Sequence, residues 1–507
     1  MRKLIATLAV AAVGLSLAAC SAQPEPGETA GSGGTLALAL IQPPTSFAPG
    51  DLKTGPSVQF YQPVYDSLLR ADNAGEPQAS VATDWSYSAD NTVLSLTLQD
   101  GITFTDGTAL DGDAVKANLE SAKGGTGDSA GQLRFLKEVD VVDATHVDLV
   151  LSAPDPSFLP NMGGVAGMLA SPAVLGDESL ETTPVGSGPY VLDDSKTQPG
   201  TKYVYTRNPE YWDLESFPYD EISISVFNDA NAVLNALRAG QIDSANIGPK
   251  DRAAIEGAGM HVESFSSYNA SGLFLFDRQG ALVPALADVR VRQAINYALD
   301  RPAIVDQAYE GEGTPTSHLF SVDSAAFLPE LEKRYPHDVD KAKALLAEAG
   351  YPDGFILPMP DVSPIYPQQQ AAATEALAAV GITAQYEPVN GQTFISDLLG
   401  AKYPAAIFNL DANRPWDTTQ TALAPSAVWN PFHTEDSTVV SLINQAQGQT
   451  GDEQEATFQE LNAYIVEQAW FAPWIQGNNI FAVAADVNVE SQKYSTFPPI
   501  WNYTPAS

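Results

Sequence analysis

One cysteine in 507 residues, Cys20, limits how this chain can be stabilised. A single thiol cannot form a disulfide within the chain, so no covalent cross-link can support a small or weakly packed domain. The apolar fraction of 44% is that of an ordinary globular protein. Because single hydrophobic cores stop growing at roughly 250–300 residues, the sequence predicts two or three domains that depend on side-chain packing alone.

Cys20 stands where an apolar stretch gives way to a polar one rich in Gly and Pro. Two basic residues precede about 15 mostly apolar ones, the layout of a secretory signal peptide and too short for a membrane-spanning helix. Residues 17–20, Leu-Ala-Ala-Cys, resemble the bacterial lipobox, in which the cysteine becomes a lipid-modified N-terminus. We therefore expect a signal peptide over 1–19, lipidation at Cys20 and a flexible tether over 20–34. The protein is then exported and anchored to the outer face of the cytoplasmic membrane, in the cell envelope.

The charge balance argues against nucleic acid as a partner. The formal net charge is -37, and the sequence shows no basic cluster to offset it. Such a surface repels phosphate backbones. After the N-terminal apolar stretch, no run approaches 18 uninterrupted apolar residues, so the sequence predicts no further membrane span.

The first part of the chain favours short strands separated by turns. We expect strands at 35–41, at 93–98 and at 147–151, with a tight turn at Asp106-Gly107. Either Asp111 or Asp113 is placed to cap a short helix that follows the turn.

From Glu221 onward the pattern changes to alternating strands and helices. A strand over 221–227, a helix ending at Gly240 and a strand over 242–247 form one strand–helix–strand unit, which implies locally parallel strand pairing. Further helices are indicated by apolar periodicity, at 288–300, 301–311, 338–350, 368–381 and 457–470. The sequence thus predicts an α/β protein with a strand-rich portion near its N-terminus.

Several segments, in consistent order, resemble the extracellular solute-binding proteins of ATP-driven importers, specifically the peptide/nickel-binding family. VYDSLLR resembles an early helix of that family, and the strongest match is ADVRVRQAINYALDRPAIV. The matching segments lie at 64–70, 84–121, 184–192, 207–213, 287–305 and 340–355.

The resemblance implies a two-lobed periplasmic-binding-protein-like fold of the cluster C type, with an extra strand-rich subdomain in the first lobe. It implies a first lobe over 35–268, a second lobe over 269–475 and a return to the first lobe over 476–507. It also implies a monomeric, non-enzymatic receptor without a cofactor. Such a receptor closes on a small ligand, most often a short peptide, and delivers it to a membrane permease driven by a separate ATPase.

The resemblance places the ligand's ammonium group against an aspartate that follows a strand in the second lobe. In AAIFNLDANRPWD this position is taken by Asp411. A turn or helix cap is the structural alternative for Asp411. Arg414 stands where the family often has an acid, and either binds a ligand carboxylate or pairs with Asp417. By analogy, the remaining candidates for the ligand site are Asn413, Trp416, Trp429, Tyr268, Gln42 and Thr45.

Other functions stay open at this point. A nickel chelate, an oligosaccharide or an opine-like solute would suit the same fold, and His433 is a candidate near such a chelate. GDSAG at 127–131 fits the pattern of serine hydrolases, with Ser129 as the nucleophile, but its polar, Gly-rich surroundings predict a loop and not the required strand-to-helix turn. The five histidines are widely separated and predict no metal site. An adhesion or signalling protein that has kept the fold is a third possibility.

Overall fold

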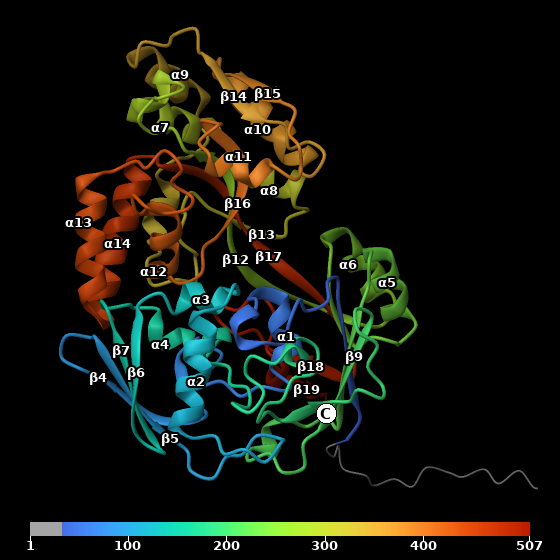
Figure 1. The fold of residues 1–507 in the computed structure, drawn as a ribbon. Coiled ribbons are helices and arrows are strands. Elements are labelled where there is room, and N and C mark those ends of the chain that lie inside the picture. Colours follow the sequence, from blue (N-terminus) through green and yellow to red (C-terminus); the bar gives the residue numbers. More distant parts are fainter. Residues whose placement is uncertain (1–32, 507) are drawn as a thin grey trace, which may run out of the picture.

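The computed structural model describes residues 33–506, so the expected signal peptide and Cys20 lie outside the described residues. The described chain forms two lobes, one above the other in Figure 1. The upper, second lobe has one large hydrophobic core that contains residues between Ala270 and Ile475. The lower, first lobe has three cores: two combine residues from the first half of the chain with residues after position 479, and the third contains residues between Leu68 and Leu169. This is the two-lobed α/β architecture that the sequence predicts.

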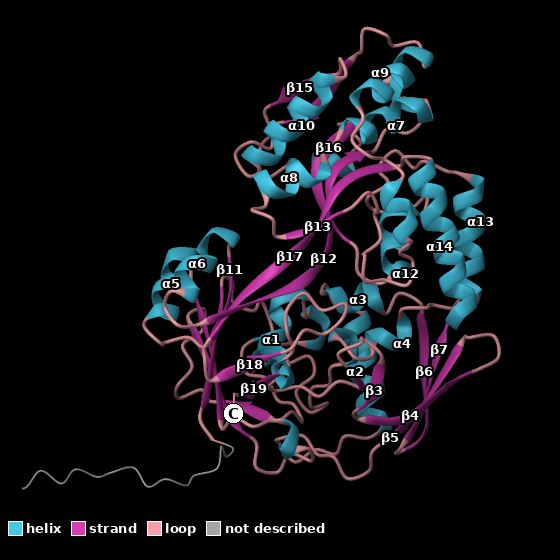
Figure 2. Cartoon of the chain, turned by 180° about the vertical axis from the view of Figure 1, so that it is seen from behind, coloured by secondary structure: helices cyan, strands magenta, loops and turns pink. Residues whose placement is uncertain are grey.

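A mixed nine-stranded sheet runs through both lobes (Figure 2). Its order is β16 (Ala405–Asp411), β12 (His261–Leu275), β17 (Phe471–Val483), β11 (Ser244–Ile247), β1 (Thr35–Leu40), β10 (Glu221–Val226), β9 (Lys202–Arg207) and β8 (Tyr190–Leu192), and β13 (Gly313–Pro315) pairs with β17 off this path.

The two long strands β12 and β17 belong to both lobes. In the first lobe they pair antiparallel with each other, and β17 also pairs with β11. In the second lobe β12 pairs with both β16 and β17. The register of β12 against β17 shifts between Ser266 and Ala270, and Tyr268 within that shift has a φ of 48°. An irregularity in both pairing and backbone thus falls where the strands pass from one lobe to the other.

The strand–helix–strand unit forms as predicted. Asp229 caps α5 (Ala230–Arg238) by accepting a hydrogen bond from the Ala232 amide, and Gly240 follows with a φ of 65°. The flanking strands β10 and β11 both run parallel to β1, which lies between them.

The strand-rich portion is a separate antiparallel sheet in the first lobe, in the order β4 (Ala82–Tyr87), β5 (Val93–Leu98), β7 (His146–Leu151) and β6 (Leu136–Asp143). The expected turn at Asp106-Gly107 is present, with a φ of 84° at Gly107. Of the two proposed caps, Asp111 caps α2 (Gly112–Lys123), which lies beside β6. The smaller elements of the first lobe are α1 (Val58–Tyr61), β2 (Leu69–Ala71), β3 (Pro77–Ala79), α3 (Asp128–Gln132), α4 (Phe158–Asn161), α6 (Arg252–Glu256), β18 (Val487–Val489) and β19 (Tyr503–Pro505).

Helices dominate the second lobe, and the side chains of Asp288 and Asp338 each cap one of them. The helices are α7 (Val289–Ala298), α8 (Arg301–Ala308), α9 (Val339–Glu348), α10 (Pro367–Ala379), α11 (Phe394–Leu399), α12 (Pro415–Thr418), α13 (Ser437–Gly448) and α14 (Gly451–Glu467), and a two-stranded sheet is formed by β14 (Ile356–Pro360) and β15 (Thr383–Glu387). Helices α13 and α14 reach down toward the strand-rich sheet (Figure 1). Across residues 33–506, no helix combines the length and the hydropathy needed to cross a membrane.

Two local predictions are wrong. The segment 64–70 was expected in a helix, but α1 ends at Tyr61 and Pro63 follows, which has no amide hydrogen for a continuing helix. Asp66 in that segment is buried and accepts hydrogen bonds from Tyr211 and Ser187. The segment GDSAG was expected as a loop, but it starts the short helix α3.

Candidate functional site

Asp411 lies at the point where the lobes meet. It is the last residue of β16 and is paired in register with Asn269, within the irregular part of β12. Water reaches its carboxylate, yet the surrounding protein removes enough solvent to raise its pKa. Within residues 33–506, no hydrogen bond or ion pair of the Asp411 side chain is found, so the structure shows no capping role for it. An accessible carboxylate without a protein partner is available to a cationic ligand group.

Near Asp411, the Tyr494 ring contacts both Tyr268 and Arg414. The rings of Tyr268 and Tyr494 lie 5.6 Å apart, and the Arg414 guanidinium lies 4.5 Å from the Tyr494 ring centroid. The Ala412 amide donates a hydrogen bond to the Tyr268 carbonyl at 2.6 Å, which ties the Asp411 segment to β12. Burial raises the pKa of Tyr268 to about 12, so its hydroxyl stays neutral at physiological pH.

Arg414 binds the first lobe. Its guanidinium donates a hydrogen bond to the Gly75 carbonyl at 2.9 Å, and no ion pair with Asp417 is found among the described residues. Burial lowers the pKa of Arg414, which remains a cation at neutral pH because its ordinary value is 12.5. Of the two alternatives for Arg414, a direct ion pair with Asp417 is not formed within residues 33–506, although the two charges interact, and the side chain connects the two lobes.

A second set of contacts joins the lobes nearby. The Trp416 indole N–H donates to Asp155 Oδ1 at 2.9 Å, and the Ser157 hydroxyl donates to Asp417 Oδ1 at 2.6 Å. The Gln447 amide on α13 also reaches the first lobe, at the Pro154 carbonyl. We define the interlobe contact as Asp155 and Ser157 on the first lobe with Trp416 and Asp417 on the second. The structure is thus closed on this side.

Of the other predicted site residues, only Asn413 is adjacent to the Asp411 segment. Trp429 packs on Phe408, with ring centroids 4.5 Å apart, in the second lobe. Gln42 and Thr45 are exposed in the loop after β1, and their side chains have no hydrogen-bond partner among residues 33–506. Asn413 stands close in sequence to Asp411, and its Oδ1 is buried without a hydrogen-bond partner in the described chain.

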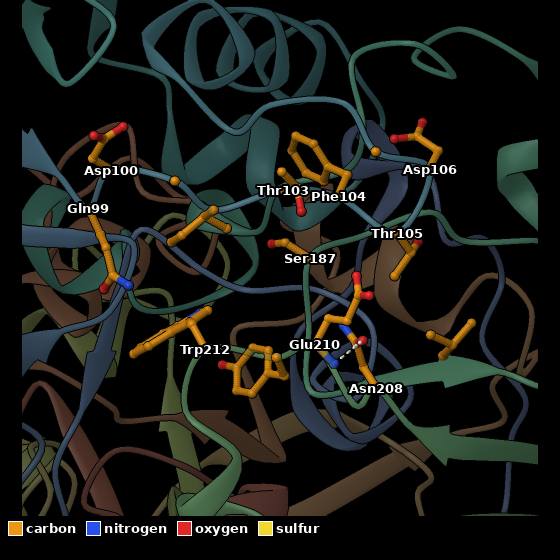
Figure 3. A pocket seen from close by; sticks show the side chains of 15 residues that line it. Gln99, Asp100, Thr103, Phe104, Thr105, Asp106, Ser187, Asn208, Glu210 and Trp212 are labelled. Atoms are coloured by element: carbon orange, nitrogen blue, oxygen red, sulfur yellow. Dashed lines mark hydrogen bonds between the residues drawn. The ribbon is translucent and has the colours of Figure 1, made fainter.

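Two cavities could take a small ligand, and Asp411 lines neither of them. One of about 350 Å³ lies between the lobes, lined by Arg414 and by residues of α13, α14 and the 154–160 segment. A larger one of about 520 Å³ lies wholly in the first lobe, between the 99–107 loop and the segment that carries Glu210 and Trp212 (Figure 3). The larger cavity has no residue of the second lobe in its lining, so lobe closure does not form it.

The hydrolase alternative is wrong. The Ser129 side chain is fully buried and donates its hydroxyl hydrogen to the Pro49 carbonyl at 2.9 Å. A nucleophilic serine needs an accessible hydroxyl that donates to a base. His433 is exposed, with Nδ1 3.1 Å from the Pro425 carbonyl. Over residues 33–506 there is no group of three or more His, Cys, Asp or Glu side chains that could hold a metal ion.

Sequence reasoning missed the residues of the first lobe that meet the second. Tyr494, Gly75, Asp155 and Ser157 carry no local signal, because their partners lie far away in the chain. Asp155 follows a strand in the sequence SAPDPS, and the Pro, Asp and Ser residues there are typical of a turn.

Comparison with known proteins places this geometry in context. Residues 76–430 match the sequence profile of the bacterial extracellular solute-binding proteins, family 5. The chain is 28% identical to the heme-binding protein A of Haemophilus influenzae, over 93% of each chain. It is 29% identical to the glutathione-binding protein GsiB of Escherichia coli, over 61% of this chain and 60% of that protein.

Solved structures show the same fold. The ABC transporter-associated periplasmic binding protein DppA from Helicobacter pylori, in complex with the peptide STSA, superposes with a TM-score of 0.75. Its identity to this chain is 20%, with 94% of this chain and 99% of that chain covered, so the likeness concerns the fold. The family match covers most of both lobes, and the chain therefore belongs to family 5 of the bacterial extracellular solute-binding proteins, the non-catalytic receptors that bind a small solute outside the cytoplasm for ABC importers.

Proposed function

We propose that the solute is a short peptide with a free N-terminus, and that Asp411 binds its ammonium group. The observation that supports this most directly is the Asp411 carboxylate itself, accessible, without a protein partner, and located between the lobes. A peptide ammonium buried in a closing cleft needs a carboxylate, since an unpaired buried charge is very costly.

Two relatives support a peptide over other solutes. One is named for binding glutathione, which is a tripeptide, and the DppA structure is a complex with the peptide STSA. In this chain, Asn413 Oδ1 is a buried acceptor without a partner, and such an atom favours a ligand that brings an N–H donor. Backbone amides of a peptide supply donors of that kind.

Capture follows from lobe closure. Open and closed forms exchange, the ligand binds the closed form better, and binding shifts the population toward closure. We propose that the rigid bodies are 35–268 together with 476–507, and 269–475, with the receptor acting as a monomer. The hinge would then use the irregular part of β12 around Tyr268, where the φ of 48° already departs from a regular strand.

Calorimetry tests the peptide assignment. The protein is unfolded and refolded to remove carried-over ligand, then titrated with mixed peptides of two to five residues and with an N-acetylated set. We expect binding of the free peptides and a loss of at least about tenfold in affinity on acetylation, because acetylation removes the charge that Asp411 pairs with. Equal binding of both sets would contradict the role of the ammonium group, and binding of neither would contradict the peptide assignment.

Heme is a second candidate, favoured by the match to heme-binding protein A over 93% of both chains. The same refolded sample, titrated with hemin, would show a shifted Soret band on specific binding. A nickel chelate or an oligosaccharide would be the next solute to test if neither peptides nor hemin bind.

We also propose that Cys20 carries the lipid that tethers the receptor near its permease, which raises the local receptor concentration. The lipobox resemblance of residues 17–20 supports this. Replacing Cys20→Ser is expected to move the protein from the membrane fraction to the soluble fraction of bacteria that express it. The parent chain fractionated in parallel is the control, and an unchanged distribution would contradict lipid anchoring.

A further inference from the structure

The interlobe contact brings two carboxyl groups together from opposite lobes. Asp155 accepts from Trp416, and Asp417 accepts from Ser157, so each carboxyl is bound to a residue of the other lobe. The Asp155 side chain is fully buried, and its Oδ2 has no hydrogen-bond partner in the described chain. An ionised carboxylate normally has all its oxygens solvated or hydrogen-bonded, so this environment favours the neutral acid.

Few positive charges offset this pair. The Arg134 guanidinium is 3.9 Å from Asp155 Oδ1 and is itself well exposed, which weakens its effect. On the second lobe, the Arg414 charge acts on Asp417 and opposes the rise in its pKa, but desolvation is the larger effect and the guanidinium hydrogen bond goes to the Gly75 carbonyl. Tyr87, on the strand-rich sheet, adds a neutral phenol close to Asp155.

We propose that the interlobe contact is a proton-dependent latch, which holds the receptor closed when a proton is bound at the Asp155–Asp417 pair and releases it when that proton leaves. Trp416 and Ser157 supply the hydrogen bonds of the latch, and the two carboxyl groups supply its pH dependence. The latch differs from the proposed ligand site, because it needs neither Asp411 nor a peptide.

The direction of the effect follows from linkage. In the closed form, desolvation raises the pKa of both Asp155 and Asp417 above the ordinary value of 3.8. In the open form the lobes separate and water returns to both groups, so their pKa values fall back toward the ordinary value. The closed form therefore binds protons more tightly. The closed fraction is largest at low pH and falls as the pH rises from about 4 through the raised pKa values of the two carboxyl groups.

Pulsed electron spin resonance can measure closure without any ligand. Spin labels are placed at Lys123→Cys on α2 and Lys343→Cys on α9, both exposed, in the chain carrying Cys20→Ser. Residues 33–506 contain no native cysteine to interfere. We expect the closed population, relative to the open one, to fall about tenfold between about pH 4 and about pH 8, since one unit of pKa shift changes the equilibrium tenfold.

Three variants separate charge from contact. Asp417→Asn keeps an acceptor for Ser157 but cannot ionise, so we expect more closure at about pH 8 and a weaker pH dependence, which Asp155 alone then supplies. Ser157→Ala removes the donor alone and should lower closure at every pH while the pH dependence stays. Glu375→Gln, exposed on α10, is the charge-matched control and should change nothing.

Either of two results would overturn the proposal. One is a parent chain whose label distances do not change with pH; the other is an Asp417→Asn chain that keeps the full pH dependence. Because no peptide is present, failure here leaves the peptide assignment untouched, and failure of peptide binding leaves the latch untouched.

Discussion

Replacing Asp411→Asn is expected to weaken the binding of a free-amino peptide by about 30- to 1000-fold, or about 2–4 kcal/mol. The substitution removes the negative charge and leaves the ligand's ammonium group buried against a neutral amide. The folded protein should lose little stability, because no hydrogen bond or ion pair of Asp411 is found within residues 33–506. Calorimetry with the tightest free peptide measures the affinity, and a urea unfolding curve measures the stability.

The same variant has two controls. An N-acetylated peptide should bind the parent and the variant with similar affinity, since it carries no charge for Asp411 to pair with. Asp397→Asn, which breaks an exposed pair with Lys402 elsewhere in the second lobe, should leave peptide affinity unchanged. Unchanged affinity of the free peptide for Asp411→Asn would remove Asp411 from the ligand site.

Replacing Arg301→Met is expected to lower the free energy of unfolding by about 3–5 kcal/mol. Arg301 is buried at the start of α8, and its guanidinium donates to four backbone carbonyls and one side-chain oxygen. The acceptors are the carbonyls of Thr316, Pro473, Asn296 and Tyr335, and Asn296 Oδ1. A methionine fills similar space but leaves these acceptors without a donor.

Burial lowers the pKa of Arg301 to about 10, so the side chain is still charged at neutral pH and its loss removes charge-assisted hydrogen bonds. Urea unfolding followed by circular dichroism measures the change. Arg290→Met on α7 is the matched control, because Arg290 is well exposed and its only ion pair within residues 33–506 is with Asp288, so the substitution should cost much less stability than Arg301→Met. An equal loss of unfolding free energy in the two variants would show that the buried hydrogen bonds of Arg301 stabilise the fold no more than an exposed ion pair does.

The Arg301 network also explains the segment with the strongest family resemblance. In 287–305, Arg292 donates to the carbonyls of Gln468 and Leu286, and Asn296 donates to the Phe471 carbonyl. These bonds fasten α7 to the end of α14 and to the start of β17. The segment therefore serves to assemble the second lobe and does not touch Asp411.

Local elements could be predicted because their causes are local. The caps at Asp111, Asp288 and Asp338 each act on an amide two or three residues later, and the apolar spacing of α7 lies within ten residues. In segment 64–70, by contrast, Asp66 is buried by its hydrogen bond with Tyr211, which is distant in sequence and has no local signal.

The site was predicted only in part for the same reason. Asp411 could be proposed from the family resemblance, as the aspartate that follows a strand, but only the structure shows that its side chain has no hydrogen-bond or ion-pair partner within residues 33–506. Arg414 could not be assigned, because its contacts are a backbone carbonyl at Gly75 and the ring of Tyr494. The residues next to Arg414 in the chain give no indication of either contact.

The path of β17 has a consequence for how the protein folds. Strand β11 pairs with β1 on one side and with β17 on the other, where Ser244 pairs with Val483. Until the ribosome has made that late segment, the edge of β11 stays open, and an open strand edge invites pairing with other chains. The first lobe therefore cannot be completed before the chain of the second lobe is present. The pairing of β11 with β17 joins segments that are far apart in the sequence, and such contacts slow folding. Chains that end before β17 are expected to aggregate, although they carry nearly every residue of the second lobe.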